Sequence, residues 1–472
     1  MLKLTLDQAI QHALAKNYSI KVQSYAVPIA QANLLGEIGK FDPALTASYI
    51  AGRNEAPQLL DPTTGLRPSA LLTRTEDYEF GLGGLLPWGM NYKLGASAAN
   101  DRGTFNLFAN QYSTFAGVTA TQPLLRDFGF GPTLASIRIA QANRAISEWQ
   151  FKQILIETIT GVTVAYNELN FSLACLRSAL RSRELAHQLL TENERRYQVG
   201  SMSEFDVTSA RSRLASREEA ILIAARQVKN AENFLKQFII DDRTPSLLSV
   251  TLDIAPPPPA PIVVVDPAAD FRVALKQRPD YQHALLAVKR GDLTYRLRRN
   301  QLLPRVDLVG SYGYNGFDGD FRVARHQVRH QDYRTYSAGV AVSVPLSFTA
   351  ERARYRAAKF GLRQAEADLQ RLEQEIVVRV GNAAGQIETT QNRVTAARRA
   401  RELAQATLDA EVKRLRAGTS STFFVLQQQE ILSGQEVLEL RAEADYQEAL
   451  ADYDRQIGVT LDKLHVQIES PR

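Results

Sequence analysis

The sequence has little of what several common protein classes require. It has one cysteine, Cys175, so no disulfide can form within the chain. That cysteine lies in an apolar helical pattern, which favours a small buried side chain over a reactive nucleophile. No run approaches the roughly 20 apolar residues of a membrane-spanning helix. A helix signal at Thr5–Gln8 follows Met1 almost directly, so no signal peptide is visible.

Charge of one sign is not concentrated anywhere. The 472 residues carry a formal net charge of +5, with arginines interleaved with glutamates in stretches such as Arg363–Glu375. Such alternation is typical of a solvated helix face. Nucleic-acid binding requires a concentrated basic patch, and we therefore expect no nucleic-acid partner.

Catalytic and metal-binding constellations are also scarce. His326 and His330 lie four residues apart in RVARHQVRH, which we interpret as a basic loop between strands rather than a helix face that could hold a metal. The glycines of Gly81–Gly84 lie in a strand pattern, not at a phosphate-binding turn. Asp318–Asp320 lacks the further ligands of a calcium loop. We expect no enzyme activity, no cofactor and no metal site.

What the sequence does contain is an internal duplication. RYQVGSMSEFDV (Arg196–Val207) matches RLRAGTSSTFFV (Arg414–Val425) without gaps. Two upstream pairs keep the same order: FDPAL with LLPRV, and QPLL with VPLS. Repeats of this kind define the architecture. They predict a first repeat at 1–240 and a second at 267–472, joined by a stiff proline-rich linker at 241–266.

Each repeat is expected to contain a leading helix, a strand region, a long helix and a returning helix. Apolar residues three and four apart, such as Leu155, Ile159, Val162, Tyr166 and Leu169, indicate a coiled-coil seam. The long helices would reach roughly 100 Å, which predicts an elongated bundle. The expected helices are 5–40, 133–198 and 203–240 in the first repeat, and 267–302, 350–416 and 421–457 in the second.

The strand regions are 44–122 and 306–345. The alternating runs 44–51 and 113–122 correspond to 306–314 and 339–345, and a further hairpin is indicated at 78–99. Alternation with tyrosines near the strand ends suits a membrane β-barrel, although a soluble antiparallel sheet would look similar. Four strands cannot close a barrel alone in lipid, where an open edge is not tolerated, so several subunits would share one.

Together these motifs resemble the TolC-like outer-membrane efflux proteins (outer membrane factors). Further marks are QPLLRDFGFGP after the strands and RPDYQHALLAVKRGDLTYRLRRNQLLPRVDL at the start of the second repeat. The resemblance implies an α+β membrane protein, with a coiled-coil α-helical barrel in the periplasm and a β-barrel in the bacterial outer membrane. It implies a homotrimer in which four strands per subunit form a twelve-stranded barrel in the membrane lipid. An export signal would then have been removed from this sequence.

The function implied is that of the exit duct of a tripartite efflux or type I secretion system. A periplasmic adaptor (membrane fusion) protein would bind the duct, and an inner-membrane transporter would act with it indirectly. By the resemblance, the adaptor docks at two turns, Val199-Gly200-Ser201 and Ala417-Gly418-Thr419. Two alternatives stay open: a soluble coiled-coil scaffold, and a periplasmic adaptor, which would not show two matched repeats.

The resemblance also implies a periplasmic gate near the turns. Arg196, Tyr197 and Asp206 match positions of a polar network that holds such entrances shut. The usual arginine partner of that carboxylate falls at Ser420, and the usual acidic constriction falls at Phe424 and Gln427. We therefore expect a constriction lined by Phe424, Phe423 and Gln427 that closes by packing and dewetting. In the competing interpretation, both phenylalanines belong to the coiled-coil core.

Overall fold

The computed structural model describes residues 2–58, 63, 70–464 and 466. The remaining positions, which include the end of the second predicted repeat, lie outside the described residues. By their internal contacts the residues form two compact units, a helical unit (1–28, 146–285 and 368–472) and a unit that contains the main sheet (29–145 and 286–367). Each unit contains residues of both predicted repeats, whose boundaries stay a prediction.

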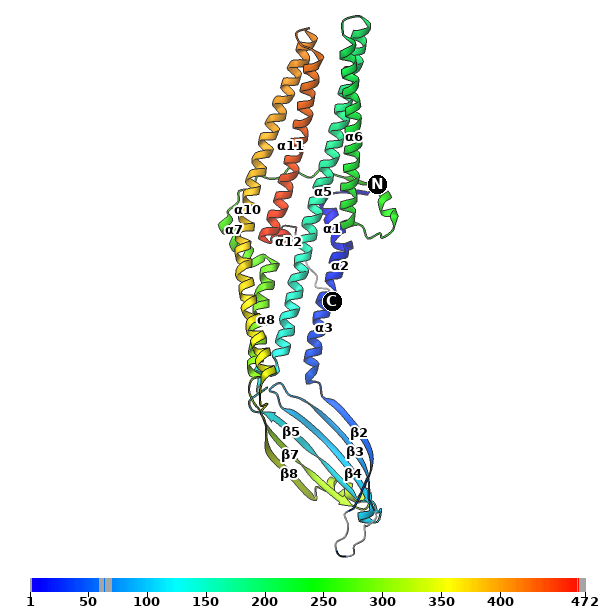
Figure 1. Cartoon of the computed structure of the whole chain (residues 1–472), viewed down its shortest axis with the longest axis vertical. Coiled ribbons are helices and arrows are strands. Elements are labelled where there is room, and N and C mark those ends of the chain that lie inside the picture. Colours follow the sequence, from blue (N-terminus) through cyan, green and yellow to red (C-terminus); the bar gives the residue numbers. More distant parts are fainter. Residues whose placement is uncertain (1, 59–62, 64–69, 465, 467–472) are drawn as a thin grey trace. The chain divides into compact units, whose positions relative to one another are not determined.

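The helical unit is built on two hairpins of helices (Figure 1). The first joins α5 (Ala135–Gln198) to α6 (Glu204–Ile239), and the second joins α10 (Thr349–Arg416) to α11 (Thr422–Ile457). The predicted seam is buried in both: Ile159, Val162 and Leu169 pack with Leu235, and Ile376, Val380 and Ile387 pack with Tyr446. Among the described residues, no helix is both long and apolar enough to cross a membrane.

The leading helices are interrupted, where the sequence predicted continuous ones. The first is divided into α1 (Leu6–Lys16), α2 (Tyr18–Ser24) and α3 (Ala26–Ile38), because the Asn17 side chain accepts from the backbone N–H groups of Ser19 and Ile20 and starts a new helix. The second is divided into α7 (Pro267–Gln277) and α8 (Pro279–Asn300). Arg278 precedes a proline and adopts an extended conformation.

The proline-rich linker is ordered against the helices. Its strand β6 (Leu252–Ile254) pairs in parallel with β1 (Leu2–Leu4), a pairing that the sequence did not predict. The Tyr166 hydroxyl lies 3.1 Å from the Leu4 carbonyl oxygen and 2.5 Å from that of Ala255. Tyr446 donates to the Pro261 carbonyl at 2.6 Å. These hydrogen bonds hold the linker on α5 and α11.

A buried ion pair fastens the same strand to α6. Glu232 accepts from the Leu252 N–H at 2.7 Å, and its carboxylate lies 3.6 Å from the Lys236 ammonium. Both side chains are almost fully buried, at 3% and 0% exposure. Burial alone would raise the pKa of Glu232, but the N–H and the neighbouring lysines hold it below its ordinary value.

The second unit contains one antiparallel sheet in the order β2-β3-β4-β5-β7-β8 (Figure 1). The strands are β2 (Ala44–Ala56), β3 (Leu71–Leu85), β4 (Asn91–Gly103), β5 (Tyr112–Pro123), β7 (Arg305–Asp318) and β8 (Tyr333–Ser343). The resemblance implied four strands per chain, whereas the described sheet has six. The hairpin predicted at 78–99 forms β3 and β4 and lies between β2 and β5, because its long alternating strands pair along their full length with both neighbours.

The two faces of this sheet differ in chemistry. The register places Ser48, Glu79, Lys93, Thr119 and Ser311 on one face, which we call the polar face. The opposite, apolar face carries most of the large exposed hydrophobic side chains of the strands: Leu45, Tyr49, Tyr78, Phe80, Leu82, Leu94, Val118, Leu308, Tyr312, Tyr336, Val340 and Val342. An apolar face with aromatic residues is typical of strands that contact lipid.

The segment between β7 and β8 is a helix, α9 (Phe321–His330), and not the predicted loop. Asp320 caps its first turn by accepting from the Arg322 N–H at 2.8 Å. Ala324 is fully buried against the sheet, while the arginines and histidines of α9 are exposed. The local sequence carries a signal for this helix. Ala324 and Val328, four residues apart, lie on one apolar face of a helix, and the arginines around them form a basic face.

Candidate functional site: the two helical turns

The turn after α5 ends that helix in a Schellman arrangement. The Gly200 N–H donates to the Tyr197 carbonyl at 2.9 Å, and the Ser201 N–H donates to the Arg196 carbonyl at 2.9 Å. Gly200 has φ of +75°, in the left-handed region that favours glycine. Val199, Gly200 and Ser201 are all exposed, and Val199 presents 78% of its surface.

The turn after α10 repeats the same geometry. The Gly418 N–H donates to the Leu415 carbonyl at 3.1 Å, the Thr419 N–H donates to the Arg414 carbonyl at 3.0 Å, and Gly418 has φ of +74°. Even the hydroxyls correspond, since Ser201 and Thr419 each donate to the arginine carbonyl five residues earlier. Ala417, Gly418 and Thr419 are exposed. The two turns therefore offer equivalent exposed backbone.

The helices that follow these turns begin differently. Ser203 caps α6 in a reciprocal capping box with Asp206, with a 3.2 Å bond from the Asp206 N–H to the Ser203 hydroxyl. In the second repeat Phe424 replaces Asp206, and Ser421 makes no side-chain cap to α11. The structure thus places Asp206 in a local cap. Among the described residues no arginine pairs with this carboxylate, as expected from Ser420 at the position of the family's arginine.

Other predicted gate residues are not brought together either. Arg196 pairs with Glu192 of its own helix at 2.8 Å, and the Tyr197 side chain is exposed. Ser420 donates to Glu411, a contact within its own hairpin. Within the described residues these polar side chains therefore act locally.

Phe423 and Phe424 do not lie in the core of their own hairpin. They are 65% and 50% exposed, whereas the next residues, Val425 and Leu426, are 1% and 6% exposed. The two rings contact each other edge to face, with centroids 5.6 Å apart. Gln427, one turn further along α11, is also exposed. The interpretation of both rings as coiled-coil core is not supported within one chain.

The sequence did not predict the polar contacts that join the two hairpins behind the turns. Glu430 of α11 accepts from Arg213 at 3.0 Å and from Arg217 at 2.5 Å, both on α6. Ser178 of α5 donates to Glu436 at 2.5 Å. Leu189 packs against a cluster of Ala404, Leu408, Val425 and Leu432. These contacts join residues that are far apart in the sequence, so the spacing of residues along the chain does not predict them.

A denser charge cluster lies further along α11. Arg441 contacts Glu168 of α5 at 2.6 Å, Asp445 at 2.6 Å and Glu448 at 3.3 Å. Burial raises the pKa of Glu448 to about 7; Arg441 opposes the shift, and the carboxylates of Glu168 and Asp445 add to it. This carboxyl is therefore partly protonated at neutral pH.

Two further candidates from the sequence are the histidine pair of α9 and the cysteine of α5. The rings of His326 and His330 stack with centroids 3.8 Å apart on α9. In the part of the chain that the structure describes, no three His, Cys, Asp or Glu residues are grouped to hold a metal ion. Cys175 is half-buried, and burial raises the pKa of its thiol, which keeps it protonated at neutral pH.

Comparison with known proteins identifies this architecture. The family model of the outer membrane efflux proteins matches residues 89–239 and 271–459, well over half of the chain. The chain belongs to the outer membrane efflux protein family. This outer membrane efflux protein is therefore an efflux channel component of the outer membrane, and its family is one of channels rather than of enzymes. The finding favours the channel over the soluble coiled-coil scaffold.

Solved structures share the fold of this efflux protein. The outer-membrane channel OprN aligns with a TM-score of 0.70 and 20% identity, over 96% of this chain and 89% of OprN. The CmeC outer membrane channel of Campylobacter jejuni aligns at 0.67 and 16% identity, over 96% and 85%. The MtrE outer membrane channel of Neisseria gonorrhoeae aligns at 0.65 and 18% identity, over 96% and 88%. No curated protein matches the sequence.

Proposed function

We propose that three copies of this chain form a passive duct that exports solutes from the periplasm across the outer membrane. The observation that carries the proposal is the sheet, which has one apolar face and whose edge strands, β2 and β8, pair with no further strand among the residues that the structure describes. Unpaired backbone groups are not tolerated in lipid. Edge pairing between copies satisfies them, and three six-stranded sheets make a barrel of eighteen strands.

The mass of the assembly tests this proposal. We expect the full chain, expressed behind a secretion signal and extracted from outer membranes in detergent, to have the mass of three subunits. The physical reason is that edge pairing and burial of apolar surface act only between copies. Light scattering that separates protein from detergent mass would measure it. A monomer recovered from the soluble fraction without detergent would contradict the duct and restore the scaffold.

The adaptor is proposed to dock at the two turns, Val199–Ser201 and Ala417–Thr419. Support comes from their equivalent geometry, their exposure and the apolar Val199 side chain, which contacts little of its own chain. An exposed apolar side chain on a rigid turn is suited to a protein interface. An inner-membrane transporter would act with the duct through the adaptor.

Val199→Glu is expected to weaken adaptor binding about tenfold, because a charge enters the apolar centre of the contact. The measurement is the affinity of the detergent-solubilised trimer for a periplasmic adaptor protein of a tripartite efflux system. The matched control is Val264→Glu, at an exposed linker valine far from the turns in sequence. Equal affinity of the Val199 variant and the unaltered protein would remove this turn from the docking site.

The entrance is proposed to be closed by Phe423, Phe424 and Gln427. The exposure of both rings on their own chain supports this, because their apolar surface is available to the equivalent rings of other subunits. Arg196, Tyr197 and Asp206 are proposed to support the entrance indirectly, by holding the end of α5 and the start of α6. The duct itself would need no cofactor and catalyse no reaction.

A further inference from the structure

Helix α9 lies on the apolar face of the sheet, as the register shows. Thr114 is on that face, since it pairs with Ala98 and, through it, aligns with Tyr78. Its hydroxyl lies 3.1 Å from the Ala324 carbonyl oxygen of α9. Gly316 permits this approach, because a Cβ there would lie 1.9 Å from the same oxygen. The ring of Phe321 packs on that of Tyr112, with centroids 5.6 Å apart.

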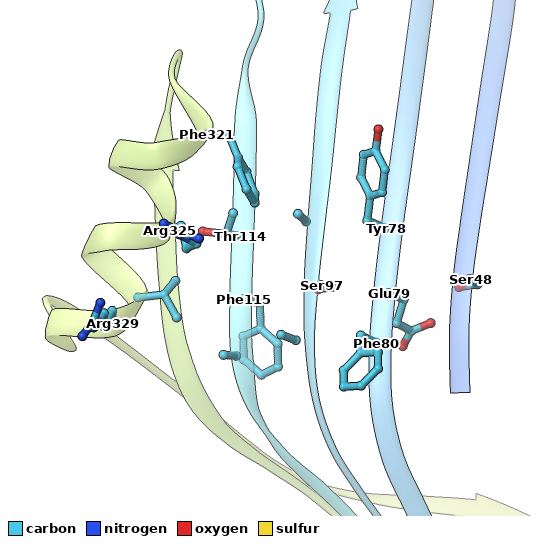
Figure 2. A pocket seen from close by; sticks show the side chains of 14 residues that line it. Ser48, Tyr78, Glu79, Phe80, Ser97, Thr114, Phe115, Phe321, Arg325 and Arg329 are labelled. Carbon is cyan, nitrogen blue, oxygen red and sulfur yellow. The ribbon is translucent and has the colours of Figure 1, made fainter. Parts of the chain in front are cut away.

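Between α9 and the sheet runs a groove of about 490 Å³. Figure 2 shows Tyr78 and Phe80 of its floor beside α9, which contributes Phe321, Arg325 and Arg329. The lining is largely apolar, so a chain of methylene groups could lie in it. The groove thus combines an apolar floor with two cations on one wall.

Those two cations have no acidic partner among the residues that the structure describes. Arg325 and Arg329 form no ion pair there, whereas Arg322 of the same helix lies 3.4 Å from Asp320. Glu79 also lines the groove, but its carboxylate belongs to the polar face and pairs with Lys93. Arg325 and Arg329 are therefore available to an external anion.

The position of α9 in the sheet unit and the charge of its two arginines indicate which ligand the groove would bind. Strands β7 and β8 join α8 and α10 at one end of the sheet, and α9 connects them at the opposite end (Figure 1). If the apolar face contacts lipid, α9 lies at the level of the headgroups of the outer leaflet. A basic amphipathic helix at an interface attracts anionic lipids, and arginine binds phosphate oxygens in a bidentate manner.

We propose that α9 and this groove form a binding site for a phosphorylated, acylated glycolipid of the outer leaflet. Its phosphate binds Arg325 and Arg329, and an acyl chain lies along Tyr78, Phe80 and Ala96. The site rests on the proposed function, because it requires the apolar face to contact lipid.

The probe is diphosphorylated lipid A, titrated into delipidated, detergent-solubilised trimer and counted by native mass spectrometry. We expect Arg325→Gln/Arg329→Gln to weaken binding about 10- to 30-fold, since each arginine near a lipid surface contributes roughly 1 kcal/mol. The control is Arg322→Gln, which removes one positive charge from the same helix at a position outside the groove, and the single variant matched to it is Arg329→Gln. Arg322→Gln is expected to change the affinity less than threefold.

Three outcomes would overturn the site: unchanged binding by the double variant, an equal loss in the Arg322 control, or equal binding of dephosphorylated lipid A. Association of trimers through α9, seen as a doubled mass, would make the occupant a second copy and also overturn it. If the double variant does not assemble, Arg329→Gln alone serves the same comparison. Failure of the proposed function is distinguishable, because the unaltered protein would then not be trimeric.

Discussion

Replacing both Phe423 and Phe424 with alanine is expected to raise the conductance of the resting channel several-fold. In a trimer the two rings of each subunit would give six aromatic side chains at the entrance. Apolar constrictions close by excluding water, so removal of the rings widens and wets the path. Single-channel recording of the purified protein in planar bilayers measures this directly. Phe424→Ala alone is expected to give a smaller rise.

The chain offers a matched control for this experiment. Phe205 is the counterpart of Phe423 in the first repeat and is also exposed, but Asp206 follows it where Phe424 stands in the second. Phe205→Ala removes the same ring from an equivalent helix start and is expected to leave the conductance unchanged. If the double alanine variant conducts like the unaltered protein, the phenylalanines are not the gate. In that case the Arg213 and Arg217 contacts to Glu430 become the next candidates for holding the hairpins closed.

Glu232→Gln is expected to destabilise the protein by about 3–5 kcal/mol, because it leaves the Lys236 ammonium buried without a counter-charge. The Lys236 Nζ makes no hydrogen bond among the described residues, so the carboxylate 3.6 Å away is its main compensation. Lys236→Met should cost less, since Glu232 keeps the Leu252 N–H and Lys229 as partners. Thermal melting of the detergent-solubilised protein would rank the variants.

A double variant makes this prediction specific. Glu232→Gln/Lys236→Met removes both charges and is expected to recover most of the loss, because a neutral pair needs no buried compensation. Glu218→Gln, at an exposed position of the same helix, should change stability by less than about 0.5 kcal/mol.

Since the pKa of Glu232 is lowered by folding, its contribution to the stability of the folded protein is present at neutral pH and disappears as the pH falls below the ordinary carboxyl range. Additive losses in the double variant would show that the pair is not coupled.

The long helices and their turns could be predicted because their causes are local. The three-and-four spacing of apolar residues predicts the α5 and α10 seams, which are buried at Ile159 and Ile387. The duplicated glycines predict left-handed residues at 200 and 418, and both have the expected φ. The sequence left Phe424 with two interpretations, a constriction or the coiled-coil core, because an apolar residue in a coiled-coil pattern is ordinarily buried. The structure shows that half of its surface is exposed.

The interruptions of the leading helices have local signals in the sequence, whereas the partners of the strands do not. Arg278 breaks a helix because proline follows it, and Asn17 does so because its side chain caps the next helix; both signals were present in the sequence. The pairing of β1 with β6 joins segments about 250 residues apart and had no local signal. The position of the β3–β4 hairpin between β2 and β5 likewise depends on pairing with strands outside the hairpin.

By itself the sequence determined the duplicated repeat, the coiled-coil helices, the two glycine turns and the strand regions, because periodicity and turn chemistry act over a few residues. Only the tertiary structure decided that the sheet has six strands and that Glu430 joins two hairpins. It also placed α9 on the apolar face, where Gly316 leaves room for the helix backbone. These features follow from close packing of distant segments, whose energies appear only when the chain is folded.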